Sequence, residues 1–314
     1  MIYMKRFTLN ELLSIAHRAL FLISKNIYIL YLGIISIIFS TVFSIFQFIT
    51  PPKVSIPHNL TSNISSSSLE MLKWMFYFVN FIQHLSSSNL IIFIIIIVLY
   101  IVIAIYFTIA ASSTIIQTLS DRKNWESKGN FKDYWRKGIK YWSNYFIYSI
   151  LFGIMFFIVF LIFMVISTFL VSINSLFLIL VLIFGIILLV YILSIAYIGI
   201  RLVLIEDMDI IDGIRYSFSL VKNNFSLFLN ISLFYLVTLL ILYLIANVIE
   251  SVIISVLHSL YTSFGLTFTY PVIVIALLII IFILGILAVY SSAFWTGVFI
   301  ELRDDKKLFK IAHI

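Results

Sequence analysis

Six long runs of uncharged, mostly apolar residues constrain this chain more than any other feature. They cover roughly residues 27–49, 90–111, 145–171, 176–200, 225–249 and 272–298. Each exceeds the ~18 residues that a helix needs to cross the hydrocarbon core of a membrane. Only 11% of the 314 residues are charged, whereas soluble domains carry about 25%. The sequence therefore predicts an all-α integral membrane protein with six transmembrane helices in a single polytopic domain, residues 1–314.

The distribution of positive charge predicts the orientation of these helices. All of the 20 Lys and Arg residues except Lys53 and Lys73 lie in segments that would share one side of the membrane. Because Lys and Arg accumulate in cytoplasmic loops, we expect the N- and C-termini to be cytoplasmic in a cell-membrane protein. The net charge of +7 then belongs mainly to a cytoplasmic surface that attracts anionic lipid headgroups.

The segment 50–89 is predicted to be an extracytoplasmic insert between the first two spans. It begins Pro-rich, continues as "TSNISSSS" and ends in an aromatic run. Its Asn59 and Asn63 open N-glycosylation sequons. We interpret the aromatic run as a helix on the outer interface, anchored by Trp74 and Tyr77; the alternative is a binding lid.

A recurring pattern indicates a three-fold repeat of helical hairpins. Before spans one, three and five, apolar residues recur at steps of three and four, the period of one helical face. This predicts a cytoplasmic amphipathic helix before each outgoing span, lying in the headgroup plane; the alternative is a simple extension of the span. Each stripe carries an Asn directly before its last member: Asn26, Asn144 and Asn224. The stripes are Leu13, Ala16, Leu20, Ile23, Ile27; Phe131, Tyr134, Gly138, Tyr141, Tyr145; and Ile211, Ile214, Phe218, Val221, Phe225.

Signatures of catalysis are absent from the sequence. There are no cysteines, the five histidines are scattered, and no glycine-rich loop precedes Lys-Ser or Lys-Thr. The sequence therefore predicts a non-enzymatic protein without catalytic, cofactor-binding or metal-binding residues.

Three residues are candidates for a polar mouth for a proton or cation. Glu250 is an acid that adjoins a long apolar run continuing beyond it, and ionisable residues in a membrane are functional candidates. Asn247 lies one helical turn before it and His258 about two turns after it on a similar face. The alternative is that Glu250 is a carboxylate at the level of the outer headgroups.

Basic residues next to the spans are candidates for contact with lipid or a partner. The segment 121–142 mixes basic residues with Trp and Tyr, which is typical of a membrane surface anchor; base stacking is the alternative. The candidate contact residues are Arg122, Lys123, Lys132, Arg136, Lys137, Lys140, Arg215 and Lys222.

An acidic cluster follows Arg201, which closes the fourth span. Asp209 and Asp212 stand where the third amphipathic helix begins, and carboxylates are favoured at a helix N-terminus. A capping role explains them, with a Mg²⁺ or Ca²⁺ site as the alternative. The small polar stretches "AASST" (110–114) and "YSSAFWTG" (290–297) are best explained by close helix packing.

The chain resembles a family of uncharacterised six-span prokaryotic membrane proteins related to the membrane domain of some glycerophosphoryl diester phosphodiesterases. The resemblance rests on "TIIQTLSDRKNWESKGNFKDYWRKGIKYW", "IRLVLIEDMDIIDGIRYSFSLVKNNF" and "GVFIELRDDKK". It implies the six-helix arrangement with cytoplasmic termini and no particular chemistry. Members fused to the phosphodiesterase carry a separate catalytic barrel for which this chain has no room, so the resemblance implies no hydrolase activity here.

These observations together favour a scaffold or translocation partner in an envelope or lipid-related assembly. The expected partners are anionic membrane lipids and a membrane or cytoplasmic protein, with nucleic acid only as a translocated cargo. Two alternatives stay open: a small-solute or ion carrier lined by Glu250 and Asn230, and the pore subunit of a larger translocation machine.

Overall fold

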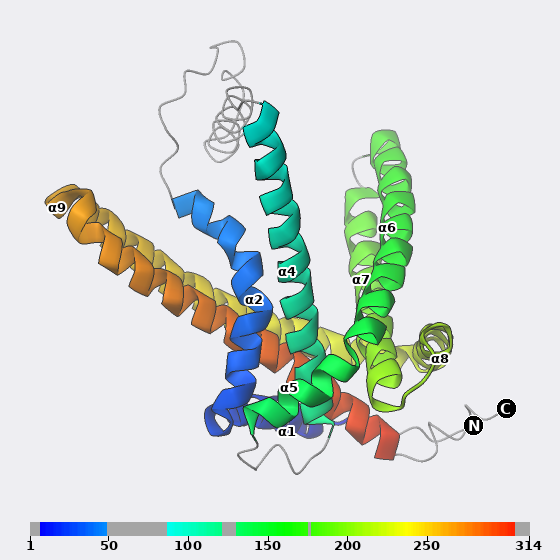
Figure 1. Ribbon diagram of the computed structural model, residues 1–314. Helices are drawn as coiled ribbons and strands as arrows, with labels where there is room; N and C mark the ends of the chain where they lie inside the picture. The colour runs from blue at the N-terminus through cyan, green and yellow to red at the C-terminus, as the bar shows by residue number, and fades with distance from the viewer. Residues whose placement is uncertain (1–6, 49–86, 121–129, 175–176, 305–314) are drawn as a thin grey trace. The chain divides into compact units, whose positions relative to one another are not determined.

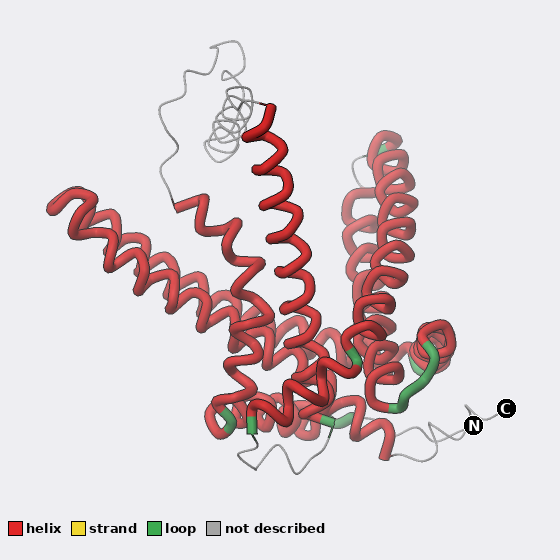
Figure 2. The backbone as a smooth tube through the Cα atoms, in the orientation of Figure 1, coloured by secondary structure: helices red, strands yellow, loops and turns green. Residues whose placement is uncertain are grey.

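The described part of the protein is almost entirely helical. The computed structural model describes residues 7–48, 87–120, 130–174 and 177–304, and among these residues there is no β-strand (Figure 2). Figure 1 shows the helices in chain order, and their bounds are α1 (Leu9–Lys25), α2 (Ile27–Phe48), α4 (Ser87–Leu119), α5 (Phe131–Lys140), α6 (Trp142–Ile173), α7 (Phe177–Ile205), α8 (Ile210–Asn223) and α9 (Phe225–Asp304).

Five helical stretches are long and apolar enough to cross a membrane, or six if the bent pair α1 and α2 is counted as one span. They are Ile94–Leu119, Trp142–Leu170, Phe177–Ile205, Phe225–Ile253 and Val274–Asp304. In water-free surroundings every backbone amide must find its partner inside the chain, and a helix meets this requirement. The prediction of an all-helical chain with several helices suited to crossing a membrane is therefore confirmed for the described part, while the number of six spans stays a prediction.

Helix α9 reverses its direction along its 80 residues. A straight helix of that length would measure about 120 Å, but the hydroxyl of Tyr235 lies 2.6 Å from the hydroxyl of Ser291. Figure 1 shows the outgoing limb in yellow and the returning limb in orange to red. The limbs correspond to the predicted spans at 225–249 and 272–298.

The chain divides into two compact parts. The first part contains the residues up to Ile37 and those from Thr108 onward, and the second part runs from Ile38 to Phe107. Helices α2 and α4 each pass from one part to the other. In the first part α7 packs against α6, α8 and α9, and α1 packs against α9.

Short helices precede α2, α6 and α9, as the sequence predicted. The axes of α1 and α2 differ by 96°, so α1 is not a straight extension of the span that follows it. Asn26 ends α1 and Asn224 ends α8, with their amide N–H groups bonded to the carbonyls of Leu22 and Leu220. The third junction is at Tyr141, so Asn144 lies inside α6, and two of the three recurring Asn residues end a short helix.

The buried faces of the short helices differ in part from the predicted stripes. Leu13 and Leu20 of α1 are exposed, as are Ile211 and Phe218 of α8. The residues that α1 buries are Leu12, Ile15, Ala16, Ala19 and Leu22. Two apolar faces lie side by side on α1, and the periodicity alone does not indicate which of them faces protein.

Each short helix begins with a side chain that caps its free amides. The hydroxyl of Thr8 accepts from the amide of Glu11 and the carboxylate of Glu11 accepts from the amide of Thr8, which forms a capping box. Asn130 accepts from the amide of Lys132 before α5, and Asp209 accepts from the amide of Ile211 before α8. These caps explain why the helices start where they do.

The core of the first part lies where the ends of α4, α7 and α9 meet α1. Its fully buried side chains include Ile115 and Leu119 of α4, Leu202 of α7, and Trp295 and Phe299 of α9. Small residues allow some of the closest contacts. A Cβ added to Gly33 of α2 would lie 2.6 Å from the carbonyl oxygen of Gly285, and such close approach stabilises helix pairs in lipid, where the hydrophobic effect does not.

Several predicted features fall outside the described residues. These are the insert's segment 49–86, with its sequons and the anchors Trp74 and Tyr77, together with Arg122 and Lys123. They stay predictions.

Candidate functional site

The residues of the predicted polar mouth are helical, but only one of their side chains is described. Asn247 is partly buried and donates its side-chain amide to the carbonyl of Tyr243, one turn earlier in α9, at 3.0 Å. The side chains of Glu250 and His258 lie outside the described set. The polar mouth therefore stays a prediction.

The described basic candidates are exposed on the short helices. Lys132, Arg136, Lys137 and Lys140 belong to α5, and Arg215 and Lys222 to α8. The ammonium of Lys140 lies 5.6 Å from the ring of Tyr141, within cation–π range. Arg215 forms an exposed ion pair with Asp212 at 3.6 Å, a contact of little energetic weight.

The acidic turn between α7 and α8 has a structural role. Asp209 caps α8, as expected, and Asp207 adopts a φ of 52°, a left-handed conformation that Asp tolerates better than most residues. Burial, together with the neighbouring carboxylate of Asp207, raises the pKa of the Tyr141 hydroxyl above its usual value of 10. Among the described residues no cluster of three or more His, Asp and Glu could hold a metal ion.

The most unusual polar group in the described part is the guanidinium of Arg201. Arg201 lies in the last turns of α7, and its side chain is 1% exposed. Its Nη1 donates to the carbonyl of Tyr197 at 2.7 Å, and its Nη2 donates to the carbonyl of Ser292 at 2.9 Å. Its Nε donates to the hydroxyl of Thr296 at 3.2 Å. The side chain therefore ties α7 to the returning limb of α9.

Aromatic rings and hydroxyls surround this guanidinium. The Cζ of Arg201 lies 5.7 Å from the ring centre of Tyr197, which itself stacks on Trp295 at 4.9 Å. The hydroxyl of Tyr197 lies 3.4 Å from those of Tyr235 and Ser291. We call these residues the Arg201 cluster: Tyr197, Arg201, Tyr235, Ser291, Ser292, Trp295 and Thr296.

One local signal in the sequence points to this cluster. Arg201 has apolar residues on both sides in "YIGIRLVLI", and an ionisable residue within an apolar run is a candidate for a buried functional group. The stretch "YSSAFWTG", which indicates close packing, also supplies two of the three acceptors of Arg201, Ser292 and Thr296. These acceptors lie more than 90 positions away along the chain, so local pattern could not pair them.

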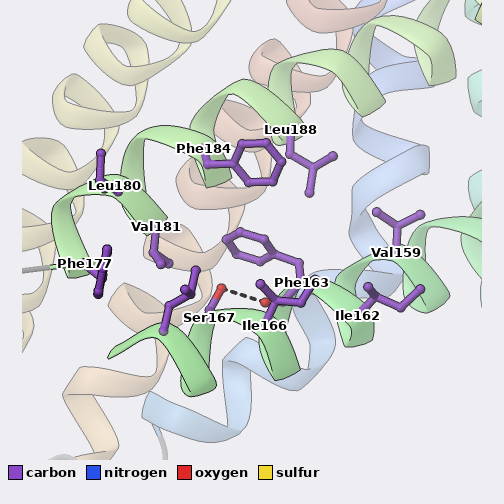
Figure 3. A pocket seen from close by; sticks show the side chains of 11 residues that line it. Val159, Ile162, Phe163, Ile166, Ser167, Phe177, Leu180, Val181, Phe184 and Leu188 are labelled. Atoms are coloured by element: carbon purple, nitrogen blue, oxygen red, sulfur yellow. Dashed lines mark hydrogen bonds between the residues drawn. The ribbon is translucent and has the colours of Figure 1, made fainter. Parts of the chain in front are cut away.

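An apolar groove lies between α6 and α7 (Figure 3). Its volume is about 460 Å³, and its one polar lining group is the hydroxyl of Ser167, which is bonded to the carbonyl of Phe163 in its own helix at 2.6 Å. Figure 3 shows Phe163 and Phe184 facing each other across it. The groove can hold hydrocarbon, and it offers no polar group for orienting a reacting substrate. Its lining residues are Val159, Ile162, Phe163, Ile166, Ser167, Leu170, Phe177, Leu180, Val181, Phe184 and Leu188.

Comparison of the chain with protein-family models, with curated proteins and with solved structures finds no match. The resemblance noted from the sequence therefore stays an expectation. The chemistry of the site follows from its geometry alone. A buried cation held by neutral acceptors can stabilise a helix contact or attract an anion, whereas the exposed basic helices can contact headgroups or an acidic partner.

Proposed function

We propose that this protein is a non-enzymatic, multi-pass membrane protein with cytoplasmic termini, acting as a scaffold or translocation partner in an envelope or lipid-related assembly. The observation that carries the proposal is the exposed apolar surface of the α6–α7 hairpin. No residue in the most apolar 18-residue window of α6 is buried, and the groove of Figure 3 opens in the same hairpin. This surface suits sideways contact with lipid or with the helices of a partner.

The packing of the short helices supports three hairpin units. Helix α1 packs on α9, whose returning limb bears Glu301, the ion-pair partner of Arg18 at 3.4 Å. Helix α5 meets α4, where the hydroxyl of Ser113 donates to the carbonyl of Gly138 at 3.0 Å. Helix α8 packs on α7. Each short helix thus lies on the returning span of the preceding hairpin, and that order closes on itself, as a three-fold repeat requires.

The contacts of the outgoing spans follow the same order. The hydroxyl of Ser194 on α7 lies 2.7 Å from that of Ser232 on the outgoing limb of α9. Gly285 on the returning limb of α9 meets Gly33 on α2. Ile116 of α4 belongs to the same buried cluster as Tyr148 of α6. Each returning span therefore also contacts the outgoing span of the next hairpin, which supports the repeat from a second set of contacts.

The basic faces of α5 and α8 supply the second element of the proposal. Six Lys and Arg side chains are exposed on these two helices, and in the proposed orientation they face the cytoplasmic leaflet: Lys132, Arg136, Lys137, Lys140, Arg215 and Lys222. Anionic headgroups or an acidic partner would bind there. The resemblance to the six-span family implies the same orientation.

The Arg201 cluster favours one alternative, a small-solute or ion carrier, because a buried ionisable group in a span marks a transport pathway in many membrane proteins. The pair Asn230 and Glu250, which the sequence suggests as the lining of such a carrier, is less consistent with this alternative. Asn230 is exposed, so in the described part it does not line an interior cavity with Glu250.

The experiment is native mass spectrometry of the protein released gently from its own membrane. We expect a stoichiometric polypeptide partner together with anionic lipid. The quadruple variant K132E/R136E/K137E/K140E should lose that partner, whereas a matched variant with Lys→Arg at 132, 137 and 140 should keep it. A particle that carries lipid only, in the wild type and in both variants, would contradict the scaffold and favour an autonomous carrier.

A further inference from the structure

The charge of Arg201 has no negative partner among the described residues. All three acceptors of its hydrogen bonds are neutral: two carbonyls and one hydroxyl. Other described arginines do pair with carboxylates, as Arg303 does with Glu206 at 3.6 Å, but those pairs are partly exposed. A buried cation without a counter-charge is unfavourable because it has lost its hydration. Among the described arginines, the most buried one therefore has no counter-charge.

The guanidinium also keeps unused donors. It carries five N–H bonds, and the three hydrogen bonds leave two of them without an acceptor in the described part. The hydroxyl of Thr296, which accepts from Nε, donates its own proton to the carbonyl of Ser292 at 2.7 Å, so that carbonyl already receives two donors. The planar fork of Arg suits the two oxygens of a carboxylate or phosphate.

Neighbouring groups of the cluster add donors. The indole Nε1 of Trp295 is fully buried and has no hydrogen-bond partner among the described residues, although a buried Trp N–H usually finds one. The hydroxyl of Tyr197 makes only two long contacts, both of 3.4 Å, so it can turn toward a better acceptor. The cluster thus combines one uncompensated positive charge with unsatisfied donors.

We propose that the Arg201 cluster binds an oxyanion, a phosphate or carboxylate group, through Arg201, Trp295 and Tyr197. Arg201 lies four residues from the end of α7 at Ile205, about 6 Å along a helix axis, so the group can come from a lipid headgroup or from a soluble anion. Binding stabilises the contact between α7 and the returning limb of α9.

The test measures the thermal unfolding of the purified full-length chain in a phosphate-free, uncharged detergent. Inorganic phosphate is titrated against chloride at constant ionic strength, and phosphatidylglycerol is added in a second arm. We expect saturable stabilisation of the wild type, with the Tm raised by about 5 °C. Arg201→Gln should abolish the shift, and Arg201→Lys, which keeps the charge but loses the fork, should weaken the apparent affinity about tenfold.

Two further variants make the test decisive. Trp295→Phe keeps an aromatic ring at the position that stacks on Tyr197 but removes the N–H, so it should weaken binding about threefold to tenfold. This variant tests the proposal if Arg201→Gln does not fold. Arg303→Gln, which alters an arginine already paired with Glu206, should respond like the wild type.

The two arms separate the sources of the group. A shift with both ligands, or with phosphate alone, supports a soluble oxyanion, and a shift with phosphatidylglycerol alone supports a lipid headgroup. The proposal is overturned if neither ligand raises the Tm, or if Arg201→Gln responds as strongly as the wild type. Because partner binding is not measured, the result is independent of the scaffold proposal.

Discussion

Gly138 lies where α5 crosses the end of α4, at one of the closest helix contacts in the described part. A Cβ at this position would overlap both the Oγ1 and the Cα of Thr114. The carbonyl of Gly138 also accepts from the hydroxyl of Ser113 at 3.0 Å. The small residues of "AASST" were correctly predicted to serve packing, but their partner Gly138 could not be identified from sequence because it lies in another helix.

The substitution Gly138→Ala should therefore be strongly destabilising. The overlap with backbone cannot be relieved by a rotamer change, so α5 must shift and lose the Ser113 hydrogen bond. We expect a loss of about 2–4 kcal/mol in the free energy of unfolding, measured by thermal or detergent-induced denaturation. The matched control is Gly153→Ala in α6, where an added Cβ meets no atom within 4 Å; it should be neutral or stabilising by up to about 1 kcal/mol. Equal effects at the two sites would contradict the close contact.

At the scale of the helix, α1 depends on its N-terminal capping box. The reciprocal bonds between Thr8 and Glu11 measure 2.8 Å and 3.3 Å, and they fix the start of a helix that places five residues in the core. The spacing Thr-x-x-Glu before an apolar run is a sequence signature of this cap. The start of α1 was therefore predictable in principle, whereas its buried face was not.

We predict that Thr8→Ala destabilises α1 by about 1 kcal/mol. The hydroxyl that satisfies the amide of Glu11 is lost, so amide hydrogen exchange in the first turn of α1 should accelerate. Thr8→Ser keeps the hydroxyl and should exchange at nearly the wild-type rate. Unchanged exchange in Thr8→Ala would show that packing alone holds the first turn.

At the scale of the whole molecule, the testable property is the orientation in the membrane. The wild-type chain has no cysteine, so single cysteines can be introduced without a background. Lys137 is exposed on α5, and Asn174 is exposed at the end of α6. In the proposed orientation these two residues lie on opposite sides of the membrane.

We expect Lys137→Cys to react with a membrane-impermeant maleimide only after the cells are permeabilised, and Asn174→Cys to react in intact cells. The reason is the bias of Lys and Arg toward the cytoplasmic side. Ser14→Cys on α1, also exposed, should behave like Lys137→Cys. The opposite labelling pattern would reverse the topology, and with it the assignment of α5 and α8 to the cytoplasmic leaflet.

The helical spans could be predicted from sequence because the reason for them is local. An uncharged run such as 145–171 must satisfy its own backbone in lipid, and it forms α6 within three residues of the expected bounds. The charge bias that predicts the orientation is likewise a property of the sequence alone.

The placement of Arg201 has a different physical origin. Its acceptors belong to Ser292 and Thr296, and only the reversal of α9 brings them to α7. In the same way, α1 turns Leu12 rather than Leu13 inward because α9 occupies that side. Such contacts depend on which helices meet and at what rotation, and lipid is as apolar as a helix surface. An apolar stripe in a membrane protein therefore does not indicate which helix packs against it. The Arg201 cluster is formed by tertiary contacts that the sequence alone does not specify.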